Sequence, residues 1–485
     1  MKNDILRIAL PSIVTNITVP LLGIVDLAIA GHIPAQATDC LSSCWEQTPS
    51  AAAIIGALSV GTLIFNMVYW LFNFLRMGTS GLTAQAFGRG DVPTQQGILR
   101  MGLIVAMGFG LLLFLLQRPI EWAASAIIAP SAEVWTLAIA YFRIRIWAAP
   151  AVLALFVMNG WLVGMQNARY PMYIAIGQNL INIVLSYLLV FQFQMDIRGV
   201  ALGTVISQYA GLAAAFLFCW QMHRRSVAHP AASQDTLSTE LSTNGMDNGF
   251  SGTSQHPNVD KNRPNSHSYQ QKDVHIAWKT FFTVNRDIFL RMVCLIAVTT
   301  AFTAYGARMG DTLLAVNTLL MQLFTLFSYF SDGFALAGEA LVGKAIGQRI
   351  SPTATIRRLF RWGWGVAVIF TLIYACGGYG LLTFFTDDEQ IHQATLPYLP
   401  WACAIPLCGI MAFIWDGIYV GATRTRPMFH SLLIGAVVFF GVYQAGIHLL
   451  PSTPSLHCHL LWAAFLLYLS TRGLVLQHCW KSKRL

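Results

Sequence analysis

Charge is scarce along this sequence. Asp, Glu, Lys and Arg make up 11% of its 485 residues, whereas hydrophobic residues make up 55%. Soluble domains carry about 25% charged residues, so this chain lacks the polar groups needed to cover a water-exposed surface. One membrane span takes about 20 apolar residues, which leaves room for roughly a dozen spans. The composition therefore indicates a polytopic all-α membrane protein.

Sequence motifs for chemistry are also missing. The chain has no Gly-rich phosphate loop, so we expect no ATP site within it, and it has no nucleophile elbow, zinc-peptidase motif or paired-cysteine metal site. A membrane-embedded enzyme would need a cluster of catalytic groups that the sequence does not show. The net charge of +9 comes without any nucleic-acid-binding motif. We therefore expect no enzyme activity, no cofactor, no metal and no nucleic-acid partner.

Hydrophobic runs separated by turns or charges predict two sets of six spans. The first run, Ile5 to Ile33, is too long for a cleavable signal and is expected to stay as a membrane helix. Seven of the nine cysteines stand singly in apolar stretches and are interpreted as small core residues. Cys40 and Cys44 share a loop, where a disulfide and two free thiols both remain open. The predicted spans are 6–31, 52–75, 97–117, 134–164, 171–192, 199–221, 283–306, 313–342, 361–385, 396–421, 428–449 and 458–478.

Basic residues gather at one set of span ends. The positive-inside rule makes that side cytoplasmic, and with an even number of spans it places both termini there, in the plasma (inner) membrane. The opposite ends hold Arg118, Arg198, Arg308 and an acidic loop at 386–395. The basic set comprises Lys2, Arg89, Arg100, Arg169, Arg224, Arg225, Lys344, Arg349, Arg357, Arg358, Arg361, Arg424, Arg426, Lys481, Lys483 and Arg484.

A polar segment divides the chain. Residues 222–278 are rich in Ser, Asn, Gln, Thr and Gly and poor in large apolar side chains, which is typical of a flexible linker. The four histidines between 229 and 275 are spaced too irregularly to indicate a metal site. The sequence thus predicts an N-terminal six-helix lobe at 1–221, a cytoplasmic linker at 222–278 and a C-terminal six-helix lobe at 279–485.

The two lobes carry an internal repeat. The run from Gly160 to Gly164 matches the run from Gly417 to Gly421 at an offset of 257 residues, and a short basic segment ending in Pro-Met follows each run. The run 81–88 matches 340–347 at an offset of 259 residues. An even number of helices per repeat gives both halves the same topology, related by an axis along the membrane normal. Such repeats leave a cleft between the halves, where transported solutes bind.

A carboxylate lies inside the first span. Asp26 has no basic residue within one turn, and the cost of a charge at membrane depth favours its protonated form. Its other interpretation is a helix-end residue bonded to backbone or water. Pro20 removes a backbone donor from the same helix and predicts a bend there. We expect Asp26 to bind the coupling ion.

The fifth and sixth spans place polar side chains at the depth of Asp26. Asn179, Asn182 and Ser186 follow the i, i+3, i+7 spacing of one helix face, and Thr204 enters from the outside on the next helix. These residues either complete a proton or ion site with Asp26 or make ordinary hydrogen bonds between helices. Both interpretations stay open.

The second span carries an aromatic and amide stripe. Asn66 and Asn73 are seven residues apart, with Tyr69 and Trp70 between them. Such a stripe could line a cavity for flat organic cations, which aromatic faces attract. Helix packing explains the same pattern equally well.

The second lobe has a different set of acids. Asp332 and Glu339 lie seven residues apart on the eighth span, and Asp416 on the tenth span corresponds to Asn159 in the repeat. Arg76 ends the second span. These four charged residues either line the substrate cavity and form gating ion pairs or are snorkelling charges at span ends.

Several stretches resemble the multidrug and toxic compound extrusion (MATE) family, in its DNA-damage-inducible-protein-F-like branch. They read ALPSIVTNITVPLLGIVDLAIAGHI, FNMVYWLFNFLRMGTSGLTAQAFGRGD, NRDIFLR, DGFALAGEALVGKAIG and FIWDGIYVGATRTRPM. The resemblance covers both lobes, but not the 34–50 insertion or the linker. It implies twelve helices in two bundles and export of organic compounds in exchange for H⁺ or Na⁺.

The resemblance also assigns individual residues. The family's first-helix carboxylate matches Asp26, its fifth-helix Asn matches Asn182, and Asp416 matches an acidic position that binds cations in another branch. Ser186 stands where related members have a second Asp, which favours protons over a two-carboxylate Na⁺ site.

Together these observations predict an efflux antiporter working by alternating access. We expect small organic substrates, surrounding membrane lipids and a functional monomer. The alternative is a flippase for lipids or lipid-linked oligosaccharides, which should have a strongly basic central cavity.

Overall fold

The computed structural model describes residues 2–32, 51–128, 131–228, 266–385, 389–449, 451 and 453–482. Helices dominate this part of the chain, and no strand occurs in it. Twelve helical segments within it are long and apolar enough to cross a membrane, which confirms the predicted number of spans. The Cys40–Cys44 pair and most of the linker lie outside the described residues.

The N-terminal lobe contains the first six spans. A 3-10 turn at Ile146–Ala148 divides the fourth span, and a π-helix at Leu188–Gln192 ends the fifth. Its helices are α1 (Lys2–Gly31), α2 (Ala51–Phe72), α3 (Phe74–Gly88), α4 (Val92–Leu115), α5 (Gln117–Ile128), α6 (Ala132–Arg145), α7 (Ala149–Gly164), α8 (Arg169–Tyr187) and α9 (Asp196–Ala228).

The C-terminal lobe repeats this plan. A 3-10 turn at Leu396–Tyr398 divides the tenth span, as the turn at Ile146–Ala148 divides the fourth. Its helices are α11 (Ser266–Ala307), α12 (Asp311–Gly347), α13 (Thr353–Phe385), α14 (Glu389–Thr395), α15 (Leu399–Gly421), α16 (Arg426–Leu449) and α17 (Pro454–Ser482).

Several segments extend beyond the sequence-based expectation. The second span continues from Ala53 through a one-residue turn at Asn73 to Gly88, well beyond the predicted end at 75. The apolar run ends near 75, but α3 stays helical because it is buried between the lobes. Helix also occupies both ends of the 222–278 segment, since α9 continues to Ala228 and α11 begins at Ser266.

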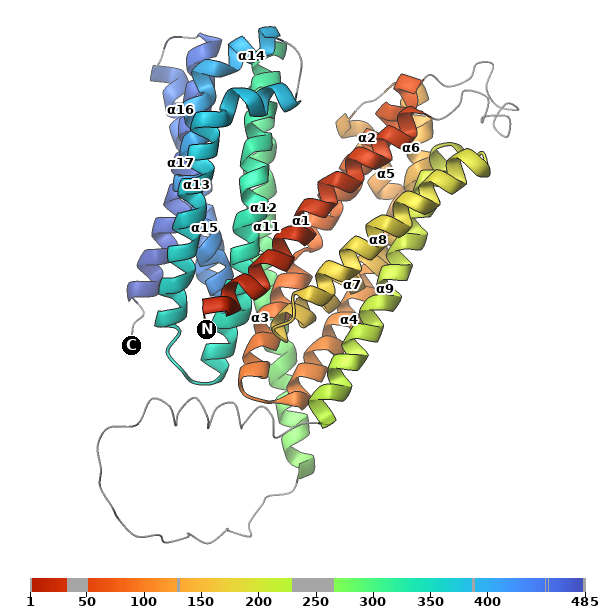
Figure 1. The fold of residues 1–485 in the computed structure, drawn as a ribbon, viewed down its shortest axis with the longest axis vertical. Helices are drawn as coiled ribbons and strands as arrows, with labels where there is room; N and C mark the ends of the chain where they lie inside the picture. The colour runs from red at the N-terminus through yellow and green to blue at the C-terminus, as the bar shows by residue number, and fades with distance from the viewer. Residues whose placement is uncertain are drawn as a thin grey trace.

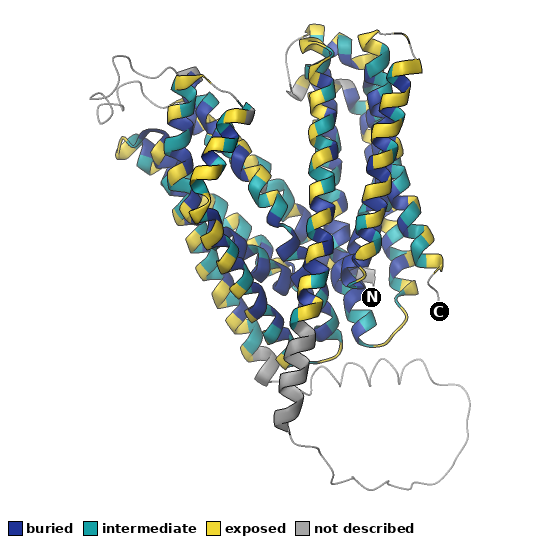
Figure 2. Cartoon of the chain, turned by 180° about the vertical axis from the view of Figure 1, so that it is seen from behind, coloured by how far each residue is buried: buried dark blue, intermediate teal, exposed yellow. Residues whose placement is uncertain are grey.

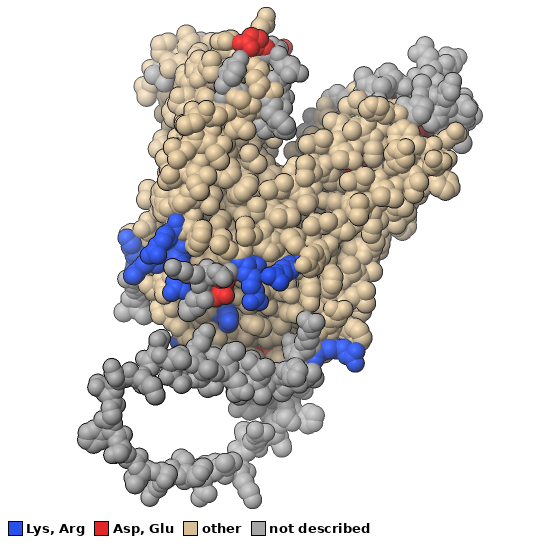
Figure 3. All heavy atoms as spheres, in the orientation of Figure 1, with Lys and Arg blue, Asp and Glu red and all other residues tan. Residues whose placement is uncertain are grey.

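The two lobes form a V (Figure 1). They approach each other near the N-terminal part of α1, along α3 and at the C-terminal part of α12, and they diverge toward the end that carries α14. The space-filling view shows a hollow between the arms at that end (Figure 3). On the same face, Lys and Arg gather toward the opposite, closed end. The structure thus has one open end and one closed, basic end.

Glycines allow the lobes to meet at the closed end. A Cβ added at Gly88 would lie 3.0 Å from the Gly347 Cα, and one at Gly347 would lie 2.9 Å from the Gly88 Cα. These glycines are the equivalent positions of the repeat, 259 residues apart. Any side chain here would force α3 and α12 apart.

Equivalent glycine contacts also recur inside each lobe. A Cβ at Gly160 would collide with the Arg76 carbonyl, and a Cβ at Gly417 would collide with the Ala335 carbonyl. The offsets between these partners are 257 and 259 residues, as in the sequence repeat. The structure therefore confirms two bundles related by a pseudo-twofold axis.

The outer faces of the helices are apolar. Exposed bands alternate with buried ones along the helices (Figure 2). On α1, for example, Leu10, Leu21 and Ile24 are 55%, 54% and 65% exposed. Apolar exposure of this extent suits a lipid environment, where it carries no penalty.

Candidate functional site

Asp26 lies half-buried on α1 and has an unsatisfied atom. Its Oδ1 is buried and accepts no hydrogen bond from any described residue. Arg145, at the end of α6, interacts with the carboxyl electrostatically. Arg145 is 119 residues away from Asp26 in the chain, so the sequence around Asp26 did not predict this neighbour. A carboxylate with one oxygen free of hydrogen bonds and one guanidinium in electrostatic range can take up a proton or a cation.

Aromatic rings hold Arg145 in place. Its guanidinium carbon lies 5.0 Å from the centre of the Phe65 ring and 5.4 Å from the centre of the Tyr141 ring. The guanidinium also donates a hydrogen bond to the Tyr141 hydroxyl. The Tyr69 hydroxyl, predicted as part of the second-span stripe, is buried and has no hydrogen-bond partner among the described residues. We therefore group Asp26, Arg145, Tyr141 and Tyr69 as the N-lobe site.

The predicted partners from the fifth and sixth spans form their own network. Asn182 donates to Thr204 Oγ1 at 3.0 Å, and Ser186 donates to Asn182 Oδ1 at 3.3 Å. Asn179 donates to the Thr18 carbonyl on α1 at 2.9 Å. The predicted clustering of Asn182, Ser186 and Thr204 is thus seen. Within the described part of the chain, no hydrogen bond joins these residues to Asp26.

Pro20 does not interrupt its helix. Both Pro11 and Pro20 lie inside α1, which is continuous from Lys2 to Gly31. A bend that responds to Asp26 stays a prediction.

The second-span stripe is divided. Asn66 and Trp70 are exposed, whereas Asn73 forms the turn between α2 and α3. There Asn73 Oδ1 accepts a hydrogen bond from Arg76 Nε at 3.1 Å. Asn73 therefore positions Arg76, and the stripe does not form one continuous face.

A buried charge cluster occupies the C-terminal lobe. Asp416 on α15 accepts hydrogen bonds through Oδ2 from Arg472 Nη2 at 2.7 Å and from Arg291 Nη2. All three residues are at most 6% exposed. Arg472 also lies over the Tyr468 ring, 5.2 Å from its centre. Both arginines compensate the Asp416 charge, so this carboxylate is not available to a free cation in this conformation.

Among the described residues, one ion pair joins the lobes. Arg76 Nη1 on α3 lies 3.7 Å from Glu339 Oε2 on α12, where Glu339 is 2% exposed. Gln85 supports the same junction by donating to the Gly421 carbonyl at 2.9 Å, and Gln166 donates to the Ala340 carbonyl at 2.7 Å. These cross-lobe bonds lie at the closed end and can keep it closed.

Asp332 is the exposed acid of the set. It precedes Gly333, which packs against α1, yet its own side chain is exposed. It interacts electrostatically with Arg76 of the N-terminal lobe and with Arg291, Arg472 and Asp416 of its own lobe. Asp332 therefore lies close to the lobe junction and can be reached by solvent.

The sequence-based reasoning missed three arginines. Arg145, Arg291 and Arg472 each lie within a predicted span, and the rule that intramembrane charges are functional applies to them as it does to Asp26. The sequence interpretation named Arg76 but did not apply this rule to these three arginines.

The fold and the charges define a class of protein. Two pseudo-symmetric helical lobes with an opening at one end, a junction at the other and ionisable groups at membrane depth define a membrane transporter. A family model described as MatE matches residues 48–188 and 288–442. The chain belongs to this family, and its relatives are transport proteins rather than enzymes.

Individual comparisons agree with the family. DNA damage-inducible protein F of Escherichia coli (strain K12) is 34% identical over 477 residues, covering 98% of this chain and 91% of its own. Protein DETOXIFICATION 44, chloroplastic, of Arabidopsis thaliana is 21% identical, covering 97% of this chain and 80% of its own. Among solved structures, the Vibrio cholerae MATE transporter VcmN in the bent form superposes with a TM-score of 0.75 at 14% identity, covering 99% and 97%.

Proposed function

We propose that this MATE-family protein exports small organic compounds, preferably cations, in exchange for protons that bind Asp26. The observation that carries the proposal is the buried Oδ1 of Asp26, which has no hydrogen-bond partner among the described residues and belongs to a carboxyl group that interacts electrostatically with Arg145, in a structure that is open at one end. The positive-inside rule assigns the closed, basic end to the cytoplasm, so the open end faces outward. A proton from outside can then reach the N-lobe site.

Protonation changes the charge of the N-lobe site. Unprotonated Asp26 balances Arg145, whereas protonated Asp26 leaves the guanidinium uncompensated among the aromatic rings. The positive charge that remains repels a cationic substrate and favours its release outward. Substrate and proton therefore act on one site without sharing an atom.

The exposed Asp332 gives cationic substrates a first point of attraction near the lobe junction. The charges in this region balance, because the three cations Arg76, Arg291 and Arg472 are matched by the three acids Asp332, Glu339 and Asp416. The flippase alternative needs a strongly basic centre, and this balance gives it no support.

The test is export from proteoliposomes under an imposed pH gradient. We expect Asp26→Asn to lower the rate of proton-driven export of a cationic dye at least about tenfold. This corresponds to an increase of about 1.4 kcal/mol in the activation free energy. Asp26→Asn should also remove the dependence of dye binding on pH. Thr136→Ala, which removes one exposed hydrogen bond of 2.9 Å to the Ala132 carbonyl within α6, is the control and should retain both properties.

Three outcomes would contradict parts of the proposal. Wild-type export by Asp26→Asn would exclude Asp26 as the coupling group. Export driven by a Na⁺ gradient at constant pH would replace the proton by Na⁺. Lipid translocation without dye export would favour the flippase.

A further inference from the structure

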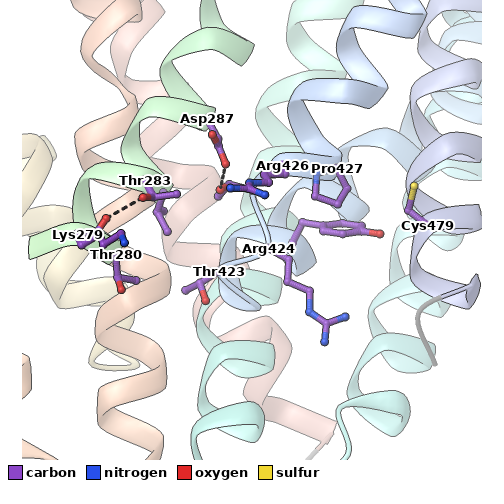
Figure 4. Close-up of a pocket in the computed structure, with 12 residues that line it drawn as sticks. Lys279, Thr280, Thr283, Asp287, Thr423, Arg424, Arg426, Pro427 and Cys479 are labelled. Atoms are coloured by element: carbon purple, nitrogen blue, oxygen red, sulfur yellow. Dashed lines mark hydrogen bonds between the residues drawn. The ribbon is translucent and has the colours of Figure 1, made fainter. Parts of the chain in front are cut away.

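A cavity opens at the basic end of the C-terminal lobe, away from the N-lobe site. It measures about 630 Å³ and lies between residues 279–287 of α11, the α15–α16 connection and the end of α17 (Figure 4). Three cationic residues line it: Lys279, Arg424 and Arg426. All three are exposed, so their charges remain available to a ligand in the cavity.

The positive charge of this cavity is uncompensated. Its one acid, Asp287, is 5% exposed; it accepts a hydrogen bond from Thr425 Oγ1 at 2.9 Å and pairs with Arg286 at 3.0 Å. No ion pair joins Lys279, Arg424 or Arg426 to a described residue. Three exposed cations around a cavity favour an anionic ligand such as a phosphate group.

A second, apolar cavity continues along the same two helices. It measures about 600 Å³ and is lined by Cys294 and Ala297 of α11 and by Leu433, Val437 and Phe440 of α16. Both helices run away from the basic end. The groove begins seven residues beyond Asp287 on α11 and seven beyond Arg426 on α16. At a rise of 1.5 Å per residue, it lies about 10 Å deeper in the membrane.

A tryptophan ring lies beside one of the cations of the basic cavity. The Arg424 guanidinium carbon lies 5.8 Å from the centre of the Trp480 ring. Trp is enriched where the membrane meets water, and basic pockets between helices on the cytoplasmic side bind anionic lipid headgroups.

We propose that the α11–α16 face binds one anionic phospholipid. Its phosphate lies among Lys279, Arg424 and Arg426, and one acyl chain follows the groove past Leu433 and Val437. The alignment of a cationic cavity with an apolar groove fits a lipid better than a free anion, because a free anion has no apolar part that could occupy the groove. This site is independent of the export proposal, because it lies outside the lobe junction.

Lipid titration of the delipidated full-length protein by native mass spectrometry tests the headgroup half. We expect wild type to bind one phosphatidylglycerol in preference to phosphatidylcholine. The triple variant Lys279→Gln, Arg424→Gln, Arg426→Gln should bind phosphatidylglycerol about 100-fold more weakly, because each cation near an anionic lipid contributes about fivefold. The charge-matched control is Arg357→Gln, Arg358→Gln, Arg361→Gln on α13, which should bind as wild type does.

A second variant tests the groove without changing charge. Val437 is 66% exposed on the groove, so Val437→Trp should fill it and lower phosphatidylglycerol affinity about tenfold. Val368, 48% exposed on α13, provides the control Val368→Trp, which should leave affinity unchanged. Equal binding of both lipids, equal loss in both triple variants, or full displacement by inorganic phosphate would each overturn the proposal. The last of these would identify a free-anion site.

Discussion

The two lobes surround a carboxylate inside a membrane span in different ways. In the N-terminal lobe, Asp26 keeps one oxygen without a hydrogen bond and has one cation, Arg145, in its surroundings. In the C-terminal lobe, Asp416 receives hydrogen bonds from two arginines, Arg291 and Arg472. A carboxylate that two guanidiniums already neutralise has little to gain from a proton or a metal cation. This difference supports the proposed ion exchange at Asp26 and predicts a stabilising role for Asp416.

The backbone packing of the lobes is nevertheless alike. Gly164 packs on the Ser80 carbonyl just as Gly421 packs on the Glu339 carbonyl. The repeat thus keeps its close helix contacts while the side chains diverge, since Ser80 corresponds to Glu339 and Asn159 to Asp416. Symmetric packing is compatible with a rocking motion of two similar bodies, and the asymmetric charge is what the proposed ion coupling requires.

The largest expected effect concerns Asp416. Asp416→Asn leaves Arg291 and Arg472 as buried, uncompensated cations, and removing one partner of a buried ion pair costs about 3–5 kcal/mol. We expect a correspondingly lower free energy of unfolding and a lower Tm, measured by denaturant and thermal unfolding in detergent micelles. The matched variant is Asp332→Asn, which removes an exposed acid and should change stability little.

This prediction separates the two roles assigned to the acids. Wild-type stability of Asp416→Asn together with a loss of cation binding would show that Asp416 serves exchange after all. The contrast between the lobes would then be wrong.

The next effect tests the symmetric packing. Gly160→Ala and Gly417→Ala each place a Cβ against a carbonyl of a neighbouring helix, at Arg76 and Ala335. Overpacking of this kind costs about 1–3 kcal/mol, and we expect the two variants to lose similar amounts of stability. Their Tm values, measured side by side, test whether the lobes are mechanically equivalent.

Exposed helical glycines supply the controls. A Cβ at Gly108 or Gly365 meets nothing within 4 Å. Gly108→Ala and Gly365→Ala should therefore be neutral or raise stability by about 0.5–1 kcal/mol, as Ala does in helices. A large loss of stability in only one of Gly160→Ala and Gly417→Ala would show that the equivalent helix contacts of the two lobes do not contribute equally to stability.

The sequence predicted the fold well because its signals are local. Apolar run lengths gave twelve spans, and the Gly160 and Gly417 runs gave the repeat that the structure confirms. The end of the second span was the exception. There α3 is held by the opposite lobe, which a hydropathy pattern does not record.

The candidate site was harder to predict, because the depth of a residue along its helix does not determine which neighbouring helix its side chain faces. Asn182, Ser186 and Thr204 were predicted at the depth of Asp26, and they do bond to one another. The carboxyl of Asp26 instead interacts with Arg145 of α6. The rotation of α1 about its axis depends on packing against several helices at once, and a single helix pattern cannot give it.

The smallest expected effect concerns the ion pair between the lobes. Arg76 is partly exposed and lies 3.7 Å from Glu339, so the pair contributes about 1 kcal/mol or less after solvent screening. We expect a double-mutant cycle of Arg76→Gln and Glu339→Gln to give a coupling energy of that size in unfolding experiments. The same pair crosses the junction, so both single variants should also populate an opened basic end more often than wild type does.

Distance measurements between spin labels on α3 and α12 can follow that opening. Loss of a contact that forms only in the closed junction favours the opened state by the energy of that contact. A contact of about 1 kcal/mol changes the ratio of opened to closed molecules about fivefold. The exchange Arg76→Glu with Glu339→Arg should restore part of the closed population, because it re-forms the pair with its charges reversed. A closed population that stays at the wild-type level in all three variants would assign closure to the glycine contacts at Gly88 and Gly347 alone. The asymmetric charges would then act on ion binding and not on the junction.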